Sequence, residues 1–587
     1  MNPLEKIKQQ IVKAINQALG KDLVKESDLV FPPDVKMGDL SLACFGLASS
    51  FAKASEDKKE LKKTPAEIAL MLANLSELSS DRLRLGAVRA VGPYLNFTLD
   101  KTALAAELFE EIKKEKGKFG QNQSGKKQKL MIEYSNGNTH KELHIGHLRN
   151  ICYGDAVNRT LVANGHEVIP VSYVNDFGIH VAKTLWALKK FFQGEATSKD
   201  KGVFLGEVYA KGSLESENNE AAKKEINQLM TKIESREGAE YKLWQTTRKW
   251  SIKQFAQIYK QLHVKFKNTF YESEEIDEGQ KMVKQLIKAN ILKESQGAII
   301  ADLEKYGLGV LVFLRSDGTA LYPVADLPLA VKKFKKHKLN KSIYVVDIRQ
   351  GQYFKQLFKV LELMGYGQEM IHLGYEFVKL PSGIMSSRTG NIITYEDLRN
   401  ELFKRASMET KKRHTDWKEK KINEVAEKLT IGAMKFEMIK VSRTATITFE
   451  IEKALRFEGF TAAYIQYTYA RSQSILRKSQ SPKLKAQINP KSKIQNLKLE
   501  HPKELGLIMK LAKYPEIVKV AGEKYEPSEI AKYLFELAQE FNDYYHEVPV
   551  LKAEPGTRAA RLILIGAVNQ VLANGLNLLG IETMEEM

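Results

Sequence analysis

The residues from about 130 to 174 read as one strand–helix–strand unit, and this unit limits the fold more than any other feature. Leu130–Tyr134 is apolar and strand-like, a helical pattern covers about 146–164, and Val168–Val174 is a second strand. Two strands joined through one helix pack as parallel neighbours with a right-handed crossover. The pattern therefore predicts a Rossmann-like parallel sheet whose ligand site lies beyond the carboxyl ends of its strands.

The same rhythm returns later in the chain. Strand Ile343–Val346 is followed by helix Phe354–Met364 and by strand Met370–Leu373. The Lys/Glu-rich, mostly helical stretch 187–295 separates the two units, and we interpret it as an insertion into one sheet domain. A chain of 587 residues exceeds a single core, so further domains are expected.

The remaining segments predict a multidomain α/β protein. Near the N-terminus Thr64-Pro65-Ala66-Glu67 has the residues of a helix start with a capping box, inside a small α+β unit. From about 401 onward the pattern is nearly all helical. The expected organisation is an N-terminal domain, a linker, a sheet domain with its insertion, a helical connector and an all-α C-terminal domain, at 1–105, 106–128, 129–400 (insertion 187–295), 401–455 and 456–587.

The charge balance favours a polyanionic partner. The chain has 91 Lys and Arg against 72 Asp and Glu, a formal net charge of +19, although part of this excess can be ordinary solvated surface. Two cysteines exclude a disulfide framework and a cysteine-rich zinc site. No signal peptide is recognisable, and the densest apolar run, 562–579, is interrupted by four Asn or Gln residues. We therefore expect a cytoplasmic enzyme or RNA-binding protein and no membrane contact.

The stretch EYSNGNTHKELHIGHLRN, residues 133–150, places polar chemistry where the first strand passes to its helix. A helix N-terminus offers free N–H groups and a positive dipole end, which suit a phosphate. His144 and His147, three residues apart, would present two imidazoles there, and Gly146 would let a base or ribose approach the backbone. Neither GxGxxG nor a P-loop sequence occurs, so dinucleotide and P-loop binding are not supported.

Two other interpretations of these histidines compete. An isolated HxxH pair is most often structural or a surface feature. His140 and His144, with Glu142 between them, also have the i, i+4 spacing of a zinc site, but the zinc protease pattern places Glu directly after the first His. That order is absent here, so a metallohydrolase is disfavoured and no metal ligand is predicted.

The HIGH sequence at 144–147 resembles the signature of class I aminoacyl-tRNA synthetases, and the whole stretch 133–150 resembles its arginyl-tRNA synthetase version. Further segments are similar to that family in the same order along nearly the whole chain. They are MGDLSLACFGLA and VGPYLNF in the first 100 residues, GDAVNRTLVANGHEV, VNDFGIH, SDGTALYPVADLPLA, FKQLFKVLELMGY, SGIMSSRTGNIITYEDL, AAYIQYTYARSQSILRK and FNDYYHEVPVLKAE.

This resemblance implies an enzyme that activates L-arginine with ATP, accompanied by Mg²⁺, and transfers the arginyl group to tRNA-Arg. It also implies a cytoplasmic monomer, an N-terminal domain that touches the tRNA elbow, and a C-terminal helical domain that binds the anticodon. A catalytically silent tRNA-binding paralogue is the alternative. Among the C-terminal tyrosines, Tyr467 and Tyr544 are predicted to contact tRNA, because unpaired bases stack on aromatic rings.

For ATP the resemblance implies His144, Gly146 and His147, together with Met385 and Ser386 of the second signature loop. That loop departs from the family pattern, since Ile384-Met385-Ser386-Ser387-Arg388 lacks both lysines. The triphosphate still needs a cation, and Lys141 or Arg388 is predicted to supply it. Otherwise the loop is degraded and activation is lost.

For arginine the resemblance implies two groups of residues. Glu133, which would face the α-ammonium, Ser135 and Asn138 match positions around the amino-acid backbone. Asp326 would bind the guanidinium beside Tyr322, because a guanidinium pairs best with a carboxylate. Val324-Ala325 stands where the family usually has Thr-Arg, which leaves the local geometry open.

Overall fold

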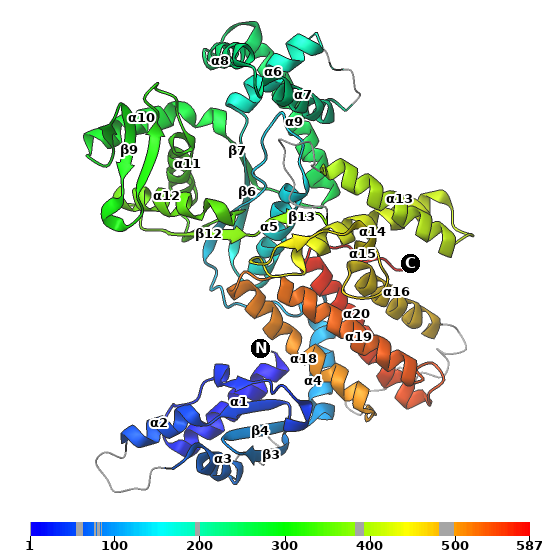
Figure 1. The fold of residues 1–587 in the computed structure, drawn as a ribbon. Helices are drawn as coiled ribbons and strands as arrows, with labels where there is room; N and C mark the ends of the chain where they lie inside the picture. Colours follow the sequence, from blue (N-terminus) through cyan, green and yellow to red (C-terminus); the bar gives the residue numbers. More distant parts are fainter. Residues whose placement is uncertain are drawn as a thin grey trace.

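A computed structural model describes residues 2–587 except 55–62, 76–77, 79–82, 84, 194–195, 197–199, 382–392 and 481–497. Met385, Ser386 and Arg388 therefore lie outside the described residues. The parallel sheet lies at the centre of the molecule, with the helices α6–α9 at one end and the N-terminal domain at the other (Figure 1). The C-terminal helices lie beside the sheet domain (Figure 1).

The central sheet has five parallel strands in the order β12-β11-β5-β6-β7. Their bounds are β5 Lys129–Glu133, β6 Glu167–Val174, β7 Asn268–Tyr271, β11 Lys341–Asp347 and β12 Glu369–Tyr375. Helix α5, Ile145–Ala163, connects β5 to β6, and α12, Gly351–Leu363, connects β11 to β12. The parallel α/β sheet is thus confirmed. The chain runs from β5 outward through β6 to β7 and returns to β11 on the other side of β5, so the strand order reverses between β5 and β11.

Four helices lie between β6 and β7 and form a separate cluster. They are α6 Ile179–Phe191, α7 Lys201–Ser216, α8 Glu220–Glu234 and α9 Gly238–Gln261. The expected insertion at 187–295 also includes β7, which is an edge strand of the main sheet, and this part of the expectation was wrong. β7 has only four residues, too few to show an alternating pattern inside a Lys-rich region.

A small antiparallel sheet packs beside the main one and was not predicted. Its strands are β8 Lys293–Ser295, β9 Ala298–Asp302 and β10 Val310–Leu314. Helices α10, Ile276–Lys288, and α11, Tyr322–His337, pack with it around a shared core that includes Phe313 and Leu327. Helix α11 matters for function because it carries the predicted Tyr322 and Asp326.

The N-terminal domain is the predicted α+β unit. Its antiparallel sheet has the order β1-β2-β4-β3, and Thr64 caps α3 in the predicted capping box with Glu67. The elements are α1 Pro3–Leu19, β1 Leu29–Val30, β2 Leu40–Ala43, α2 Phe45–Ala54, α3 Pro65–Ala73, β3 Leu85–Val91 and β4 Tyr94–Leu99. Helix α4, Lys101–Glu115, follows this domain and packs against the C-terminal helices α18 and α20 (Figure 1).

The C-terminal part is helical, as predicted. Its elements are α13 Tyr395–Arg413, α14 Glu419–Ile439, α15 Ile451–Ala454, α16 Ala462–Ser479, α18 Pro502–Glu523, α19 Ser528–Glu547 and α20 Pro555–Leu578, and β14, Ile447–Thr448, pairs with β13, Val378–Lys379. In length and composition α20 could cross a membrane, but 67% of its apolar window is buried inside the protein. Asn569 of α20 donates to Ser472 Oγ at 2.7 Å, and Asn574 donates to the carbonyl of Lys116 at 2.9 Å. The polar residues that interrupt this apolar run therefore hold neighbouring segments, as in a core helix.

Helix α5 is the element through which the sheet domain meets the C-terminal helices. Arg149, 1% exposed, donates to the carbonyls of Phe377, Ser442 and Arg443, each at 3.3 Å. Further along the helix, Asp155 accepts from Lys435 of α14 at 3.4 Å. These contacts fix the orientation of α5 and hence of its N-terminus, where the paired histidines lie.

Candidate active site

A cavity of about 400 Å³ opens where the strand order reverses, at the carboxyl ends of β5 and β11. This is the position at which open parallel sheets bind ligands. Of the predicted residues, Asn138, His144, Gly146 and His147 line it. The other lining residues are Asn136, Asn150, Val346, Asp347, Arg349, Gln350, Tyr375, Phe377 and Val378.

His144 and His147 share the first turn of α5, with ring centroids 4.0 Å apart. Nδ1 of His144 accepts from the Gly146 N–H at 3.0 Å, and Nδ1 of His147 accepts from the His144 N–H at 3.2 Å. Burial and the nearby Lys141 charge lower the pKa of His144 to about 4, and burial lowers the pKa of His147 well below its usual value. Both imidazoles are therefore neutral near pH 7 and carry their proton on Nε2, which leaves each ring one donor for a ligand.

Gly146 is required by the histidine pair itself. A Cβ at this position would lie 2.8 Å from Cε1 and 3.0 Å from Nδ1 of His144. The missing side chain thus makes room for the His144 ring to cap the helix, in addition to the backbone access predicted from the sequence.

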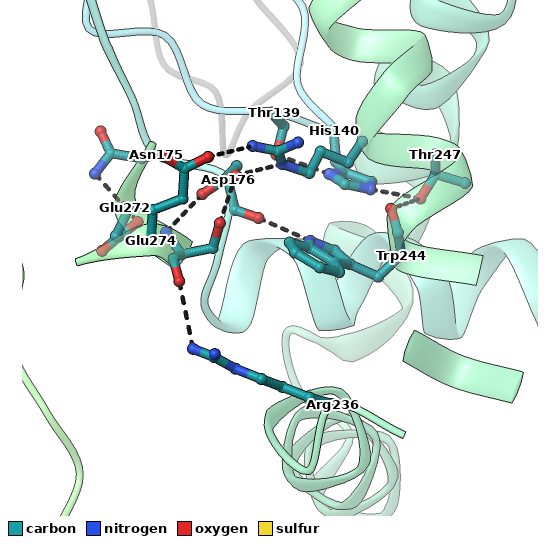
Figure 2. A network of polar contacts seen from close by, with 11 residues as sticks. Thr139, His140, Asn175, Asp176, Arg236, Trp244, Thr247, Glu272 and Glu274 are labelled. Atoms are coloured by element: carbon teal, nitrogen blue, oxygen red, sulfur yellow. Dashed lines mark hydrogen bonds and ion pairs between the residues drawn. The ribbon is translucent and has the colours of Figure 1, made fainter. Parts of the chain in front are cut away.

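His140 does not form a metal site with His144. Its ring nitrogens lie 2.9 Å from Thr139 Oγ1 and 2.8 Å from Thr247 Oγ1, so both are already hydrogen bonded (Figure 2). Burial lowers the pKa of His140 to about 3, so the ring is neutral. Among the residues that the structure describes, no group of three or more His, Cys, Asp or Glu is placed to hold a metal ion.

Lys141 lies between the histidines and the inserted helices. Its Nζ is 4.5 Å from the centroid of the Tyr209 ring on α7. Its charge also contributes to the lowered pKa of His144 and of His147. Arg388, the other predicted cation, lies outside the described residues together with Met385 and Ser386.

A second, acidic region lies around Asp326 on α11. Tyr353 of α12 donates its hydroxyl to Asp326 Oδ2 at 2.5 Å. Burial raises the pKa of Asp326 to about 6 against the effect of this hydrogen bond. Tyr322, four residues earlier, is 67% exposed, so its ring is open to a ligand.

Glu272 is a further carboxylate of this region that was not predicted. It follows β7 directly and accepts from Asn175 Nδ2 at 3.2 Å (Figure 2). Burial raises the pKa of Glu272 to about 8, and the Asp326 charge adds to that rise. A carboxylate that directly follows a strand of the parallel sheet is a candidate site residue. Glu272 was not identified in this way because β7 was expected to belong to the helical insertion.

Glu133 is already paired in the structure. The carboxylate forms an ion pair with Lys333 of α11, and both side chains are nearly fully buried, at 5% and 2% exposed. The aromatic rings of Tyr344, Phe270 and Tyr173 surround the Lys333 ammonium at 5.3, 5.4 and 6.0 Å. Glu133 therefore does not offer an unshared charge to an α-ammonium, since its negative charge is largely compensated within the protein.

The other two predicted contacts to the amino-acid backbone differ in position. Asn138 lines the cavity, and its backbone forms an isolated parallel β-bridge with Asn175. Ser135 is 2% exposed, and its Oγ is hydrogen bonded to the Tyr259 hydroxyl at 2.8 Å. The Ser135 N–H donates to Asn150 Oδ1 at 2.5 Å. In this conformation Ser135 holds the loop rather than facing the cavity.

Of the two tyrosines predicted to contact tRNA, Tyr467 is half-buried on α16 and Tyr544 is fully buried on α19. A base cannot stack on Tyr544 in this conformation, so that choice is corrected. The next residue, Tyr545, is 36% exposed. The Arg471 guanidinium lies 4.7 Å from the Tyr467 ring centroid and 5.9 Å from that of Tyr545, which brings the two rings to one cation.

Three family models match the chain and together span most of its length. The N-terminal domain model of arginyl tRNA synthetase matches residues 5–99, the catalytic domain model of class I tRNA synthetases (R) matches 109–451, and the DALR anticodon binding domain model matches 465–587.

Similar proteins extend over the same length. An arginine–tRNA ligase of Bdellovibrio bacteriovorus is 37% identical over 95% of this chain and 94% of its own, and one of Treponema denticola is 33% identical over 97% and 96%. The solved arginyl-tRNA synthetase of Thermus thermophilus superposes with a TM-score of 0.79 at 27% identity, covering 99% of both chains. That of Plasmodium falciparum gives a TM-score of 0.76 at 20% identity, with coverage of 99% and 98%, and supports the fold alone.

Proposed function

Because the chain belongs to the arginyl-tRNA synthetase family, we propose that it is an arginine–tRNA ligase that activates L-arginine with ATP and charges tRNA-Arg. The observation that carries this assignment best is the neutral His144–His147 pair on the N-terminus of α5, facing the cavity at the reversal of the strand order. Preorganised N–H donors at this place suit a triphosphate.

The reaction has two steps. A carboxylate oxygen of arginine attacks the α-phosphorus of ATP, the bond from that phosphorus to the bridging oxygen breaks, and pyrophosphate leaves with the electron pair. A ribose hydroxyl of the terminal tRNA adenosine then attacks the carbonyl carbon of arginyl-adenylate, loses its proton, and displaces AMP. In the first step the protein contributes positioning and hydrogen bonds to the phosphate oxygens, which His144 and His147 can donate through Nε2.

Charge compensation at the phosphates is assigned to Lys141. It belongs to the same loop as His144, its charge helps to lower the pKa of His144 and His147, and it can reach a phosphate as a point charge. Mg²⁺ would enter with ATP, and phosphate oxygens would supply most of its ligands. Replacing Lys141 with Ala should raise the activation barrier of adenylate formation by about 2–4 kcal/mol and so lower kcat. The KM for arginine should change little. An unchanged kcat would assign this role to Arg388 or to the magnesium ion.

Arginine specificity is assigned to the acidic region on α11 and β7. The Asp326 charge helps to raise the pKa of Glu272, and we assign the guanidinium of arginine to these two carboxylates of the acidic region. Tyr322 supplies an exposed ring beside them, against which the side chain can pack. Asp326→Ala should raise the KM for arginine severely, and an unchanged KM would show that the specificity carboxylate is elsewhere.

Pyrophosphate exchange separates the enzyme from the silent paralogue, which no observation favours. Arginine-dependent exchange of labelled pyrophosphate into ATP is expected, and we expect it to need tRNA-Arg. Absence of exchange both with and without tRNA-Arg would contradict the proposed activity. Full exchange without tRNA-Arg would contradict only the tRNA requirement.

For tRNA we propose contacts at both ends of the molecule. The N-terminal domain would touch the elbow, and Tyr467 with Tyr545 would face the anticodon beside Arg471, since aromatic and guanidinium planes stack on unpaired bases. We also propose that the protein acts as a cytoplasmic monomer. Sedimentation at micromolar concentration tests the monomer, and fractionation of cells tests the location.

A further inference from the structure

The signature loop between β5 and α5 rests on the inserted helices at three consecutive residues, 140, 141 and 142. The first of them, His140, has a left-handed backbone with φ of +62°. Helix α9 holds it there, because the His140 N–H donates to Ser251 Oγ at 2.9 Å. In addition, Nε2 of His140 lies 2.8 Å from Thr247 Oγ1 (Figure 2). A non-glycine residue in this region costs free energy and stays there only when its surroundings fix it. The inserted helix thus determines the path of the loop.

Glu142 is the next contact. Its side chain packs directly against Gly206 of α7, where an added Cβ would lie 2.3 Å from Glu142 Cγ. The glycine lets the loop approach the backbone of α7 more closely than any other residue would. Burial raises the pKa of Glu142 to about 7, in agreement with this close docking.

Lys141 lies between these two anchors and contacts the same helix. Its Nζ lies 4.5 Å from the centroid of the Tyr209 ring, one helical turn after Gly206. This distance is within the range of a cation–π interaction. Burial raises the pKa of the Tyr209 hydroxyl, but its interactions with Lys141 and Ser213 outweigh burial and lower it, in agreement with this contact.

We propose that Tyr209 is a positioning residue for Lys141, through which the insertion holds the phosphate-binding cation beside His144 and His147. The inference rests on the proposed role of Lys141 in ATP activation. A lysine has four rotatable bonds and loses much rotamer freedom when it is held in one place. Contact with the ring of Tyr209 restricts the ammonium before ATP arrives. The inserted helices α7 and α9 are then part of the catalytic framework.

The test measures kcat and the KM for ATP in pyrophosphate exchange, with tRNA-Arg present throughout. Tyr209→Leu removes the ring face at similar volume and should lower kcat roughly 3- to 30-fold, the range that a cation–π contact supports. Tyr209→Phe keeps the ring and should retain the greater part of kcat. Trp250→Leu is the matched control, since it removes a ring over Lys201 at 4.9 Å on the same inserted helices without touching the loop.

A double-mutant cycle with Lys141→Ala distinguishes positioning from folding. Once Lys141 is removed, Tyr209→Leu should cause no further loss, because its effect acts through the ammonium. An equal loss in both backgrounds, or an unchanged kcat in Tyr209→Leu, would overturn the inference while leaving the role of Lys141 intact. An unchanged kcat in Lys141→Ala would overturn both. If Tyr209→Leu unfolds, Tyr209→Met serves in the same cycle, and the thermal midpoint of each variant is measured to identify this case.

Discussion

Removing the hydroxyl of Tyr353 tests how the Asp326 carboxylate is kept ionised for its substrate. Burial raises the pKa of Asp326 to about 6, and the hydrogen bond from Tyr353 at 2.5 Å opposes that rise. A hydrogen bond to a charged group contributes about 1.5–3 kcal/mol, and 1.36 kcal/mol corresponds to one pKa unit. Tyr353→Phe should therefore raise the pKa of Asp326 by roughly one to two units, to about 7 or 8.

The sign follows from the charge that arginine needs. A guanidinium binds the ionised carboxylate, so kcat/KM for arginine falls as the pH drops through the pKa of the free enzyme. At pH 7 the ionised fraction of Asp326 should fall from about nine-tenths to between a half and a tenth, which lowers kcat/KM roughly 2- to 10-fold. Above pH 9 the variant should approach the unmodified enzyme.

The assay is kcat/KM for arginine in pyrophosphate exchange between pH 5.5 and 9.5. Glu272, whose pKa is raised to about 8, titrates in the same region, so the displacement of the whole acid limb is compared between variants. Tyr366→Phe is the control, since this tyrosine stacks on Phe334, which is also on α11, and not on Asp326. An acid limb that stays in place, or a deficit of equal size at every pH, would refute the reasoning.

Three further predictions concern stability and tRNA. Lys333→Met leaves the buried Glu133 charge unpaired and should lower the free energy of unfolding, measured by denaturant titration, by about 3–5 kcal/mol. Adding Glu133→Gln to this variant should restore much of the lost stability. An unaltered unfolding midpoint in Lys333→Met would contradict the pairing. Tyr545→Ala should weaken tRNA-Arg binding with little loss of stability, while Tyr544→Ala should lower the free energy of unfolding by about 3–5 kcal/mol. The reverse result would show that Tyr544, not Tyr545, contacts the tRNA. Affinity for tRNA-Arg should fall linearly on a log–log plot against salt, and a flat plot would exclude phosphate contacts as its source.

The central part of the fold could be predicted because its elements carry strong local patterns. The strand before His144, the helix after it and the next strand follow one another along the chain, and this order predicts a parallel sheet. β7 could not be predicted in this way, since its four residues lie in a Lys-rich helical region and become a strand only by pairing with β6. That pairing is a tertiary effect, which local periodicity does not contain.

The same distinction applies to the candidate site. His144, Gly146 and His147 lie within one helical turn, so their proximity could be inferred from spacing alone. The pairing of Glu133 with Lys333 joins residues 200 positions apart, and no local pattern announces it. Tyr544 and Tyr545 are adjacent residues on different sides of α19, so Tyr544 lies in the core and Tyr545 at the surface. The sequence alone does not show which side of α19 packs against α16 and α20.

The buried hydrogen bonds of Arg149 affect how the protein unfolds. One buried guanidinium holds three carbonyl groups from two segments beyond the sheet, and Lys435 of α14 holds Asp155 on the same helix. Pulling the C-terminal helices away would leave several of these groups in an apolar setting without partners, at a high cost for each. The backbone amides of α5 and α14 should then exchange with deuterium in a single cooperative opening, and a separately expressed sheet domain that omits α14 should not reach a stable native state.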